Sequence, residues 1–68
     1  MTLGEKLKQL RTLNNHTVKE VAIDLKITVA IISLWENDKV IPSQKNILKL
    51  ADYYKVKIIE LTKLIERR

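Results

Sequence analysis

Apolar residues recur along this chain at steps of three and four positions, which is the spacing of one face of an α-helix. The first series comprises Leu3, Leu7, Leu10 and Leu13. The second series comprises Val21, Ala22 and Leu25. Each series follows a capping-box pattern, Thr2 with Glu5 and Thr17 with Glu20, and residues 14–15 are asparagines that suit a helix end. The pattern predicts two amphipathic helices in the first third of the chain.

The next segment is ambiguous from propensity alone. Residues 27–32 are rich in β-branched side chains, which favour a strand. Against a strand, Thr28 is a suitable N-cap, and Ile32 and Trp35 stand three positions apart on one helical face. The connection to the preceding helix is also only two or three residues long. We therefore predict a helix over Val29–Glu36.

Two further helices are expected in the second half of the chain. Pro42 disfavours helical backbone at Ile41, so residues 37–42 are predicted to form a turn and an extended link. Ser43 is the expected cap of a fourth helix, whose apolar residues are Ile47, Leu48, Leu50, Ala51 and Tyr54. A fifth helix is predicted from about Ile58, with apolar residues Leu61, Leu64 and Ile65 on one side.

The two helices on either side of residues 26–28 form a recognisable unit. A short helix, a three-residue turn and a second helix, with a small residue such as Ala22 where the helices cross, is typical of a helix-turn-helix. Such a unit presents its second helix outward, and an α-helix fits the major groove of DNA. We predict one all-α domain of five helices over residues 1–68, with this motif at about residues 18–37.

Composition limits the chemistry that this domain can perform. The chain has no cysteine, and His16 is its single histidine, so we expect no disulfide, no metal site, no cofactor and no catalytic relay. The longest apolar runs are far shorter than the roughly 20 residues of a membrane span, and Lys6 and Lys8 interrupt the N-terminal apolar stretch. We expect a cytoplasmic, non-enzymatic module without membrane contact.

The charge points only weakly to a partner. Thirteen basic and eight acidic residues give a net charge of +5, which suits phosphate binding but is spread along both halves of the chain. Charge alone leaves nucleic-acid binding and simple solubility as open alternatives.

Over nearly its whole length, from Leu3 to about Leu61, the chain resembles the lambda-repressor-like (Cro and repressor type) helix-turn-helix regulators of bacteria and phages. The resemblance rests on Leu3-Gly4-Glu5-Lys6-Leu7, Leu10-Arg11, Val21-Ala22, Leu25, Ile32-Ser33, Trp35-Glu36, Lys39, Pro42-Ser43 and Asn46-Ile47-Leu48-Lys49-Leu50-Ala51. It implies a compact five-helix DNA-binding domain that binds double-stranded operator DNA. It also implies a structural ion pair between Arg11 and Glu36, which would tie the first helix to the end of the third.

The family's DNA-contacting positions correspond to a defined set in this chain. They are Thr17, Val18, Lys19, Thr28, Val29, Ala30, Ser33, Leu34, Asn37, Lys39 and Ser43. This chain departs from the family by carrying Val18 where a glutamine commonly fixes a phosphate. It also has no glycine in the turns that relatives close with one, where Lys26, Asp38 and Lys55 stand instead. A left-handed conformation at Lys26 would cost on the order of 1 kcal/mol.

The apolar character of the expected recognition helix leaves its role open. Its candidate residues are Val29, Ala30, Ile31 and Leu34. They could belong to the core after a small helix rotation, contact thymine methyl groups, or form a patch that binds another protein. The leading hypothesis is a small transcription regulator that binds operator DNA. The alternative is an anti-repressor or co-repressor that docks on a partner repressor through this face.

The last helix carries a separate expectation. In the family it often forms a two-fold contact that sets the spacing of two recognition helices. Ile58 and Leu61 match the family's packing positions, whereas Ile59, Leu64 and Ile65 are additional apolar residues and are the candidates for a contact with a second copy or another chain. The alternative is a helix that only caps the monomer core.

Overall fold

The computed structural model describes residues 1–65 and contains five helices. They are α1 (Leu3–Leu13), α2 (Val18–Leu25), α3 (Val29–Glu36), α4 (Gln44–Tyr54) and α5 (Ile58–Thr62). No strand occurs among these residues, so the predicted all-α helix-turn-helix fold is confirmed. Residues 29–36 are helical, as predicted, and within the β-branched segment only Ile27 and Thr28 lie outside the helix.

The helix starts follow from short-range hydrogen bonds. The capping boxes of α1 and α2 are both complete: Thr2 Oγ1 accepts from Glu5 N at 3.1 Å, and Thr17 Oγ1 accepts from Glu20 N at 3.1 Å. The Ser43 hydroxyl accepts from the backbone N–H of Asn46 at 3.3 Å and so caps α4. These bonds satisfy N–H groups that have no partner inside the helix.

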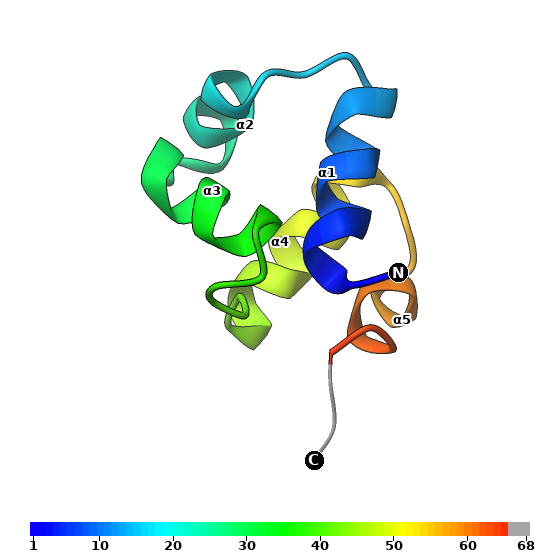
Figure 1. Cartoon of the computed structure of the whole chain (residues 1–68). Helices are drawn as coiled ribbons and strands as arrows, with labels where there is room; N and C mark the ends of the chain where they lie inside the picture. Colours follow the sequence, from blue (N-terminus) through cyan, green and yellow to red (C-terminus); the bar gives the residue numbers. More distant parts are fainter. Residues whose placement is uncertain (66–68) are drawn as a thin grey trace.

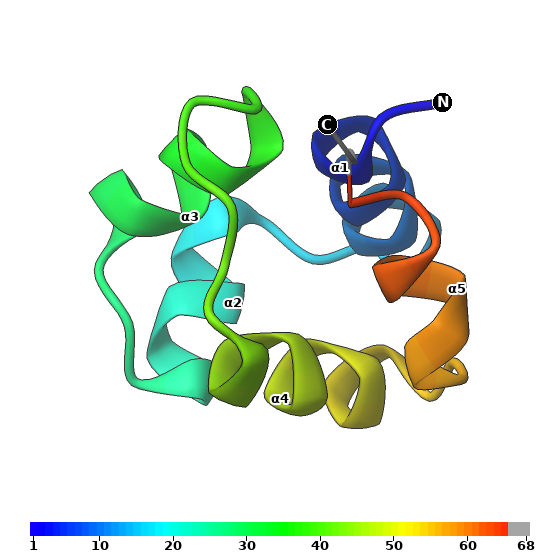
Figure 2. The ribbon, with the colours of Figure 1, turned by 90° about the horizontal axis from the view of Figure 1, so that it is seen from below.

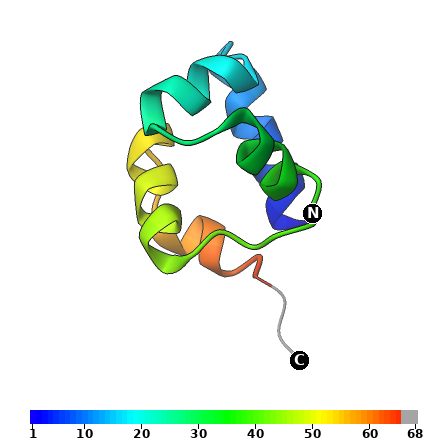
Figure 3. The same cartoon turned by 90° about the vertical axis from the view of Figure 1, so that its left-hand side faces the viewer.

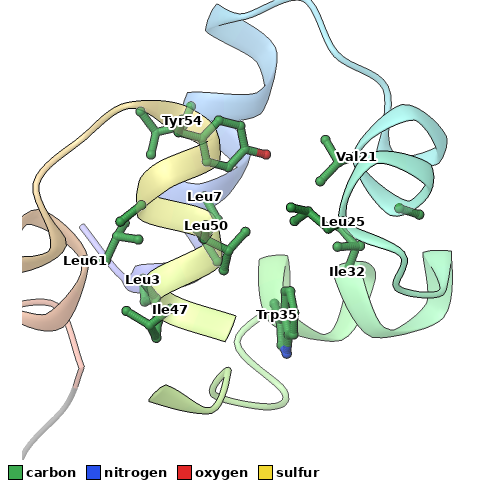
Figure 4. Close-up of a cluster of buried hydrophobic side chains, with 13 residues drawn as sticks. Leu3, Leu7, Val21, Leu25, Ile32, Trp35, Ile47, Leu50, Tyr54 and Leu61 are labelled. Atoms are coloured by element: carbon green, nitrogen blue, oxygen red, sulfur yellow. The ribbon is translucent and has the colours of Figure 1, made fainter. Parts of the chain in front are cut away.

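The helices, whose arrangement Figures 1, 2 and 3 show, surround one hydrophobic core. α1 and α2 both pack against α3, and α4 packs against α5. Figure 2 shows α4 running along the side of the molecule opposite α1. The side chains of this core cluster, most of which Figure 4 labels, are Leu3, Leu7, Leu10, Val21, Ala22, Leu25, Ile32, Trp35, Ile47, Leu50, Ala51, Tyr54 and Leu61. No helix in residues 1–65 combines the length and the apolar character that a membrane span requires.

Three details of the predicted apolar pattern are wrong. Leu13, at the very end of α1, and Leu48 in α4 are both exposed, because each lies beyond the sector of its helix that faces the core. α5 ends at Thr62, earlier than predicted. Leu64 N–H bonds to Leu61 O at 3.1 Å and Ile65 N–H to Thr62 O at 3.0 Å, so a tighter turn with three-residue steps replaces the helix.

Four non-glycine residues adopt left-handed backbone conformations: Asn15, Lys26, Asp38 and Lys55, with φ of 57–58°. Lys26 and Lys55 follow directly after α2 and α4, where a glycine would be free of steric strain. Lys26 thus has the left-handed conformation whose cost is considered above.

Replacing Lys55 by glycine is predicted to stabilise the protein by about 0.5–1 kcal/mol. Glycine removes the left-handed strain, and the greater freedom of the unfolded chain offsets part of that gain. The matched control is Lys49→Gly inside α4, which should destabilise by about 1 kcal/mol. Urea unfolding followed by circular dichroism measures both, and a loss of stability in Lys55→Gly would contradict the strain argument.

Candidate nucleic-acid interface

The turn between α2 and α3 is fixed by backbone hydrogen bonds. The N–H of Ile27 donates to Ala22 O at 2.9 Å, and the N–H of Lys26 donates to Ile23 O at 3.2 Å. Thr28 Oγ1 then accepts from the N–H of Ile31 at 3.2 Å and starts α3. Because both sides of the turn are hydrogen-bonded, the angle between the two helices is well defined.

Ile32 and Trp35 anchor the inner face of α3, and both are buried in the core. On the outer face, the exposed fractions of Val29, Ile31 and Leu34 are 48%, 40% and 41%. Ala30 and Ser33 are also exposed. The alternative in which Val29, Ala30, Ile31 and Leu34 belong to the core is therefore wrong, since the helix rotation turns them toward solvent.

Polar side chains on this face are few and largely occupied. Asn37 Nδ2 donates to Ser33 O at 2.8 Å and to Ser33 Oγ at 3.2 Å. The hydroxyl of Thr28 serves as the cap of α3. The outer face of α3 therefore presents mainly methyl groups.

A nearly buried ion pair holds α3 against α1. Arg11 donates from Nε to Glu36 Oε2 at 2.7 Å and from an Nη nitrogen to Glu36 Oε1 at 3.0 Å. The exposed fractions of the two side chains are 12% and 7%. Arg11 also donates a hydrogen bond to the backbone oxygen of His16 at 3.0 Å, which connects it to the segment just before α2. Hydrogen bonding to Glu36 raises the pKa of Arg11 above its usual value, although burial opposes this.

A second contact joins the same two helices at the other end of α1. The carboxylate of Asp38 accepts from the backbone N–H of Gly4 at 2.9 Å and from Thr2 Oγ1 at 2.6 Å. A Cβ added at Gly4 would lie 2.6–2.7 Å from the backbone oxygens of Glu36 and Trp35 and from Asp38 Oδ1. This single glycine lets the end of α3 approach α1 closely.

The remaining predicted DNA-contacting residues flank α3. α2 is capped by Thr17 and begins with Val18 and Lys19. Val18 is half-buried against the core, and Lys19 is exposed. Lys39 and Ser43 belong to the segment that runs from the end of α3 to the start of α4, which Figure 3 shows. Their roles in binding remain predictions.

α2 and α4 are joined beside this region. Tyr53 donates from its hydroxyl to Asp24 Oδ2 at 2.6 Å, and its ring lies 5.6 Å from that of His16. Burial raises the pKa of the neighbouring Tyr54 to about 12, because the phenolate would be poorly hydrated there. Within residues 1–65, no group of three or more histidine or acidic side chains lies close enough to hold a metal ion.

The candidate dimer residues differ from one another in exposure. Ile59 is exposed, whereas Leu64 and Ile65 are half-buried and pack against the chain's own core. Most of the apolar surface of Leu64 and Ile65 is thus used within the monomer. A homodimer contact stays a prediction, and Ile59 is its most accessible member.

The sequence did not reveal the role of Asp38 and Gly4, which hold the end of α3 against the start of α1. From the sequence, Asp38 is notable only because it stands where relatives have a turn glycine. Gly4 is notable only as one of the residues that carry the family resemblance. The available signal was that Gly4, the chain's sole glycine, lies in the first turn of a helix, where glycine is unfavourable without a packing reason.

The fold and the exposed second helix of its motif define a helix-turn-helix protein. A helix-turn-helix family model matches residues 7–61, so the chain belongs to this family and the predicted resemblance is confirmed. Among curated proteins, the HTH-type transcriptional activator BcrR of Enterococcus faecalis is 36% identical over 61 residues. The match covers 90% of this chain and 30% of that relative, so the chain spans less than a third of the relative's length.

Replacing Glu36 by glutamine is predicted to destabilise the protein by about 2 kcal/mol, because Arg11 loses its charged partner in a nearly buried site. Lys6→Gln is the control, since Lys6 lies 4.0 Å from Glu60 in a more exposed pair and should change stability by less than about 0.5 kcal/mol. Urea unfolding monitored by the fluorescence of Trp35, the single tryptophan, measures both. Equal effects of the two variants would show that the Arg11–Glu36 pair contributes no more than a surface pair.

Proposed function

We propose that this domain binds double-stranded operator DNA through α3 and thereby regulates transcription. The observation that carries the proposal is the geometry of α3: its inner face is buried and clamped to α1, while its outer face is exposed. A helix held in this way can enter the major groove without a costly rearrangement. Membership of the helix-turn-helix family supports the same function.

The proposed interface assigns two roles to the predicted residues. Val29, Ala30, Ser33 and Leu34 face the base edges in the major groove. The other positions contact or approach the DNA backbone, and they are Thr17, Val18, Lys19, Thr28, Asn37, Lys39 and Ser43. The caps Thr17 and Ser43 use their hydroxyl oxygens as acceptors, so each O–H is still available to donate to a phosphate.

Charge and similarity support a regulatory DNA-binding module. The net charge of +5 favours association with a polyanion. The similar BcrR protein is named as a transcriptional activator, and we propose that the part matched by this chain serves as a DNA-binding unit without enzymatic activity, metal or cofactor. Pairing of two copies through α5, with Ile59 at the contact, would allow binding to a two-fold symmetric operator.

Binding of the DNA upstream of the protein's own gene is predicted to weaken steeply with salt, because phosphate contacts release counterions. Lys39→Gln should reduce the slope of log affinity against log salt by about one. Lys63→Gln, the same change at an exposed residue after α5, should leave the slope unchanged. A titration by fluorescence anisotropy at several salt concentrations measures these slopes, and absent or salt-insensitive binding would overturn the proposal.

The exposed apolar side chains of α3 favour a second candidate function. With three aliphatic residues 40–48% exposed on one short helix, this face could dock on a partner repressor, as in an anti-repressor or co-repressor. Such a module would act on transcription without contacting DNA itself.

The double variant Ala30→Glu with Leu34→Glu separates the two functions. Both residues are exposed, so the variant should fold normally, which circular dichroism verifies. If α3 contacts DNA, the added negative charges should reduce DNA affinity at least tenfold. Unchanged DNA affinity together with lost binding to a purified repressor would favour the docking function, and no change in either would exclude α3 as the working surface.

A further inference from the structure

The outer face of α3 lacks the groups that usually distinguish guanine or adenine. Those bases are recognised by paired hydrogen bonds from arginine, lysine, asparagine or glutamine side chains. The exposed side chains within α3 are instead Val29, Ala30, Ile31, Ser33 and Leu34. Four of these five can offer only methyl and methylene groups.

The polar groups on and next to this face are few and partly engaged. The Asn37 amide nitrogen donates to both oxygens of Ser33, and Thr28 Oγ1 accepts from the backbone of α3. Asn37 would have to break its bonds to Ser33 before donating to a base edge, whereas the hydroxyls of Thr28 and Ser33 act here as acceptors and can each still donate one hydrogen bond. Direct recognition by this helix is therefore restricted mainly to apolar contacts.

Only one base offers an apolar group in the major groove, and this group is the C5 methyl of thymine. We propose, building on the proposed DNA binding, that α3 selects thymine-containing sites by packing Val29, Ala30 and Leu34 against thymine methyl groups. The ligand class is duplex DNA with C5-methylated pyrimidines where α3 enters the groove. Unmodified cytosine in the same place would leave the aliphatic side chains without a contact.

The structure gives these methyl groups well-defined positions. Of the side chains proposed to contact thymine, Val29 is β-branched and has one strongly preferred rotamer in a helix, and Ala30 has no side-chain rotamers to fix. α3 itself is anchored by Ile32 and Trp35 in the core and by Glu36 on Arg11. Since neither the helix nor the side chains of Val29 and Ala30 must be ordered on binding, their contacts can contribute fully to affinity.

Charge around α3 favours DNA over a protein as the partner of this apolar face. Lys26 precedes the helix and Lys39 follows it, and both are exposed. The acidic side chains at the two ends of α3 have other partners: Asp24 accepts from Tyr53, Glu36 from Arg11, and Asp38 from Gly4 and Thr2. An apolar strip with a lysine at each end is complementary to a methyl-lined groove between two rows of phosphates.

The test begins with selection of short duplexes from a library with a randomised centre, followed by anisotropy titration of the best-bound duplex. Each thymine is then replaced by deoxyuridine, which removes the C5 methyl and keeps the base pair. We expect affinity to fall about fourfold for every contacted methyl that is removed. Replacing a sensitive T·A pair by C·G should also weaken binding, and 5-methylcytosine in that C·G pair should restore part of the loss.

A pair of variants ties the effect to α3. Leu34→Ala should weaken binding to the thymine duplex and reduce the difference between thymine and deoxyuridine duplexes, because the methyl loses its partner. Leu13→Ala is the matched control, since Leu13 is an exposed leucine at the end of α1. It should leave the difference unchanged.

The outcomes separate this proposal from the function on which it rests. Salt-dependent DNA binding that is equal for thymine and deoxyuridine duplexes would overturn the methyl contact and leave the DNA-binding function standing. If Leu34→Ala and Leu13→Ala reduced the thymine preference equally, the preference would not arise from a contact of α3, and the proposed methyl contact would be overturned. Absence of DNA binding at low salt, with or without capture of a partner protein through α3, would overturn both.

Discussion

The contact between Arg11 and Glu36 is the interaction on which the geometry of this domain most depends. It joins α1, the helix that begins the core, to the last residue of α3, the helix proposed to meet DNA. Because both charges are nearly excluded from water, each needs the other, and the bidentate geometry restricts rotation as well as separation. Asp38 adds a second connection to the start of α1, so two separate points fix the end of α3.

Features that depend on residues close together in the sequence could be predicted. The two capping boxes require only a threonine and a glutamate three positions apart, and the structure forms both. α3 is helical despite its β-branched residues because Ile32 and Trp35 bury the same face, and burial outweighs a small propensity. The left-handed conformation at Lys26 was suggested by the family resemblance, because relatives carry a glycine at this turn.

Features that depend on distant parts of the chain could not be predicted. Whether Leu48 is buried depends on how α4 is rotated against its neighbours, which spacing alone does not determine. The same applies to the candidate site. From the sequence alone, the outer residues of α3 could lie in the core or on the surface, and only the rotation of α3 in the structure decides between these positions. The bonds of Asp38 to Gly4 and Thr2 span more than thirty residues, and no local pattern announces them.

The composition of the outer face of α3 is not explained by folding. The core contains Ile32 and Trp35 from this helix and would be unchanged if Val29, Ile31 and Leu34 were polar. Polar residues of high helix propensity, such as glutamine or lysine, would stabilise α3 at least as well as Val29 and Ile31 and would be better hydrated. Folding therefore does not require exposed aliphatic side chains here, whereas a contact that buries them on binding does. In the proposed complex with DNA, the weak and dispersed net charge would provide general attraction, and the methyl groups of α3 would provide the selectivity.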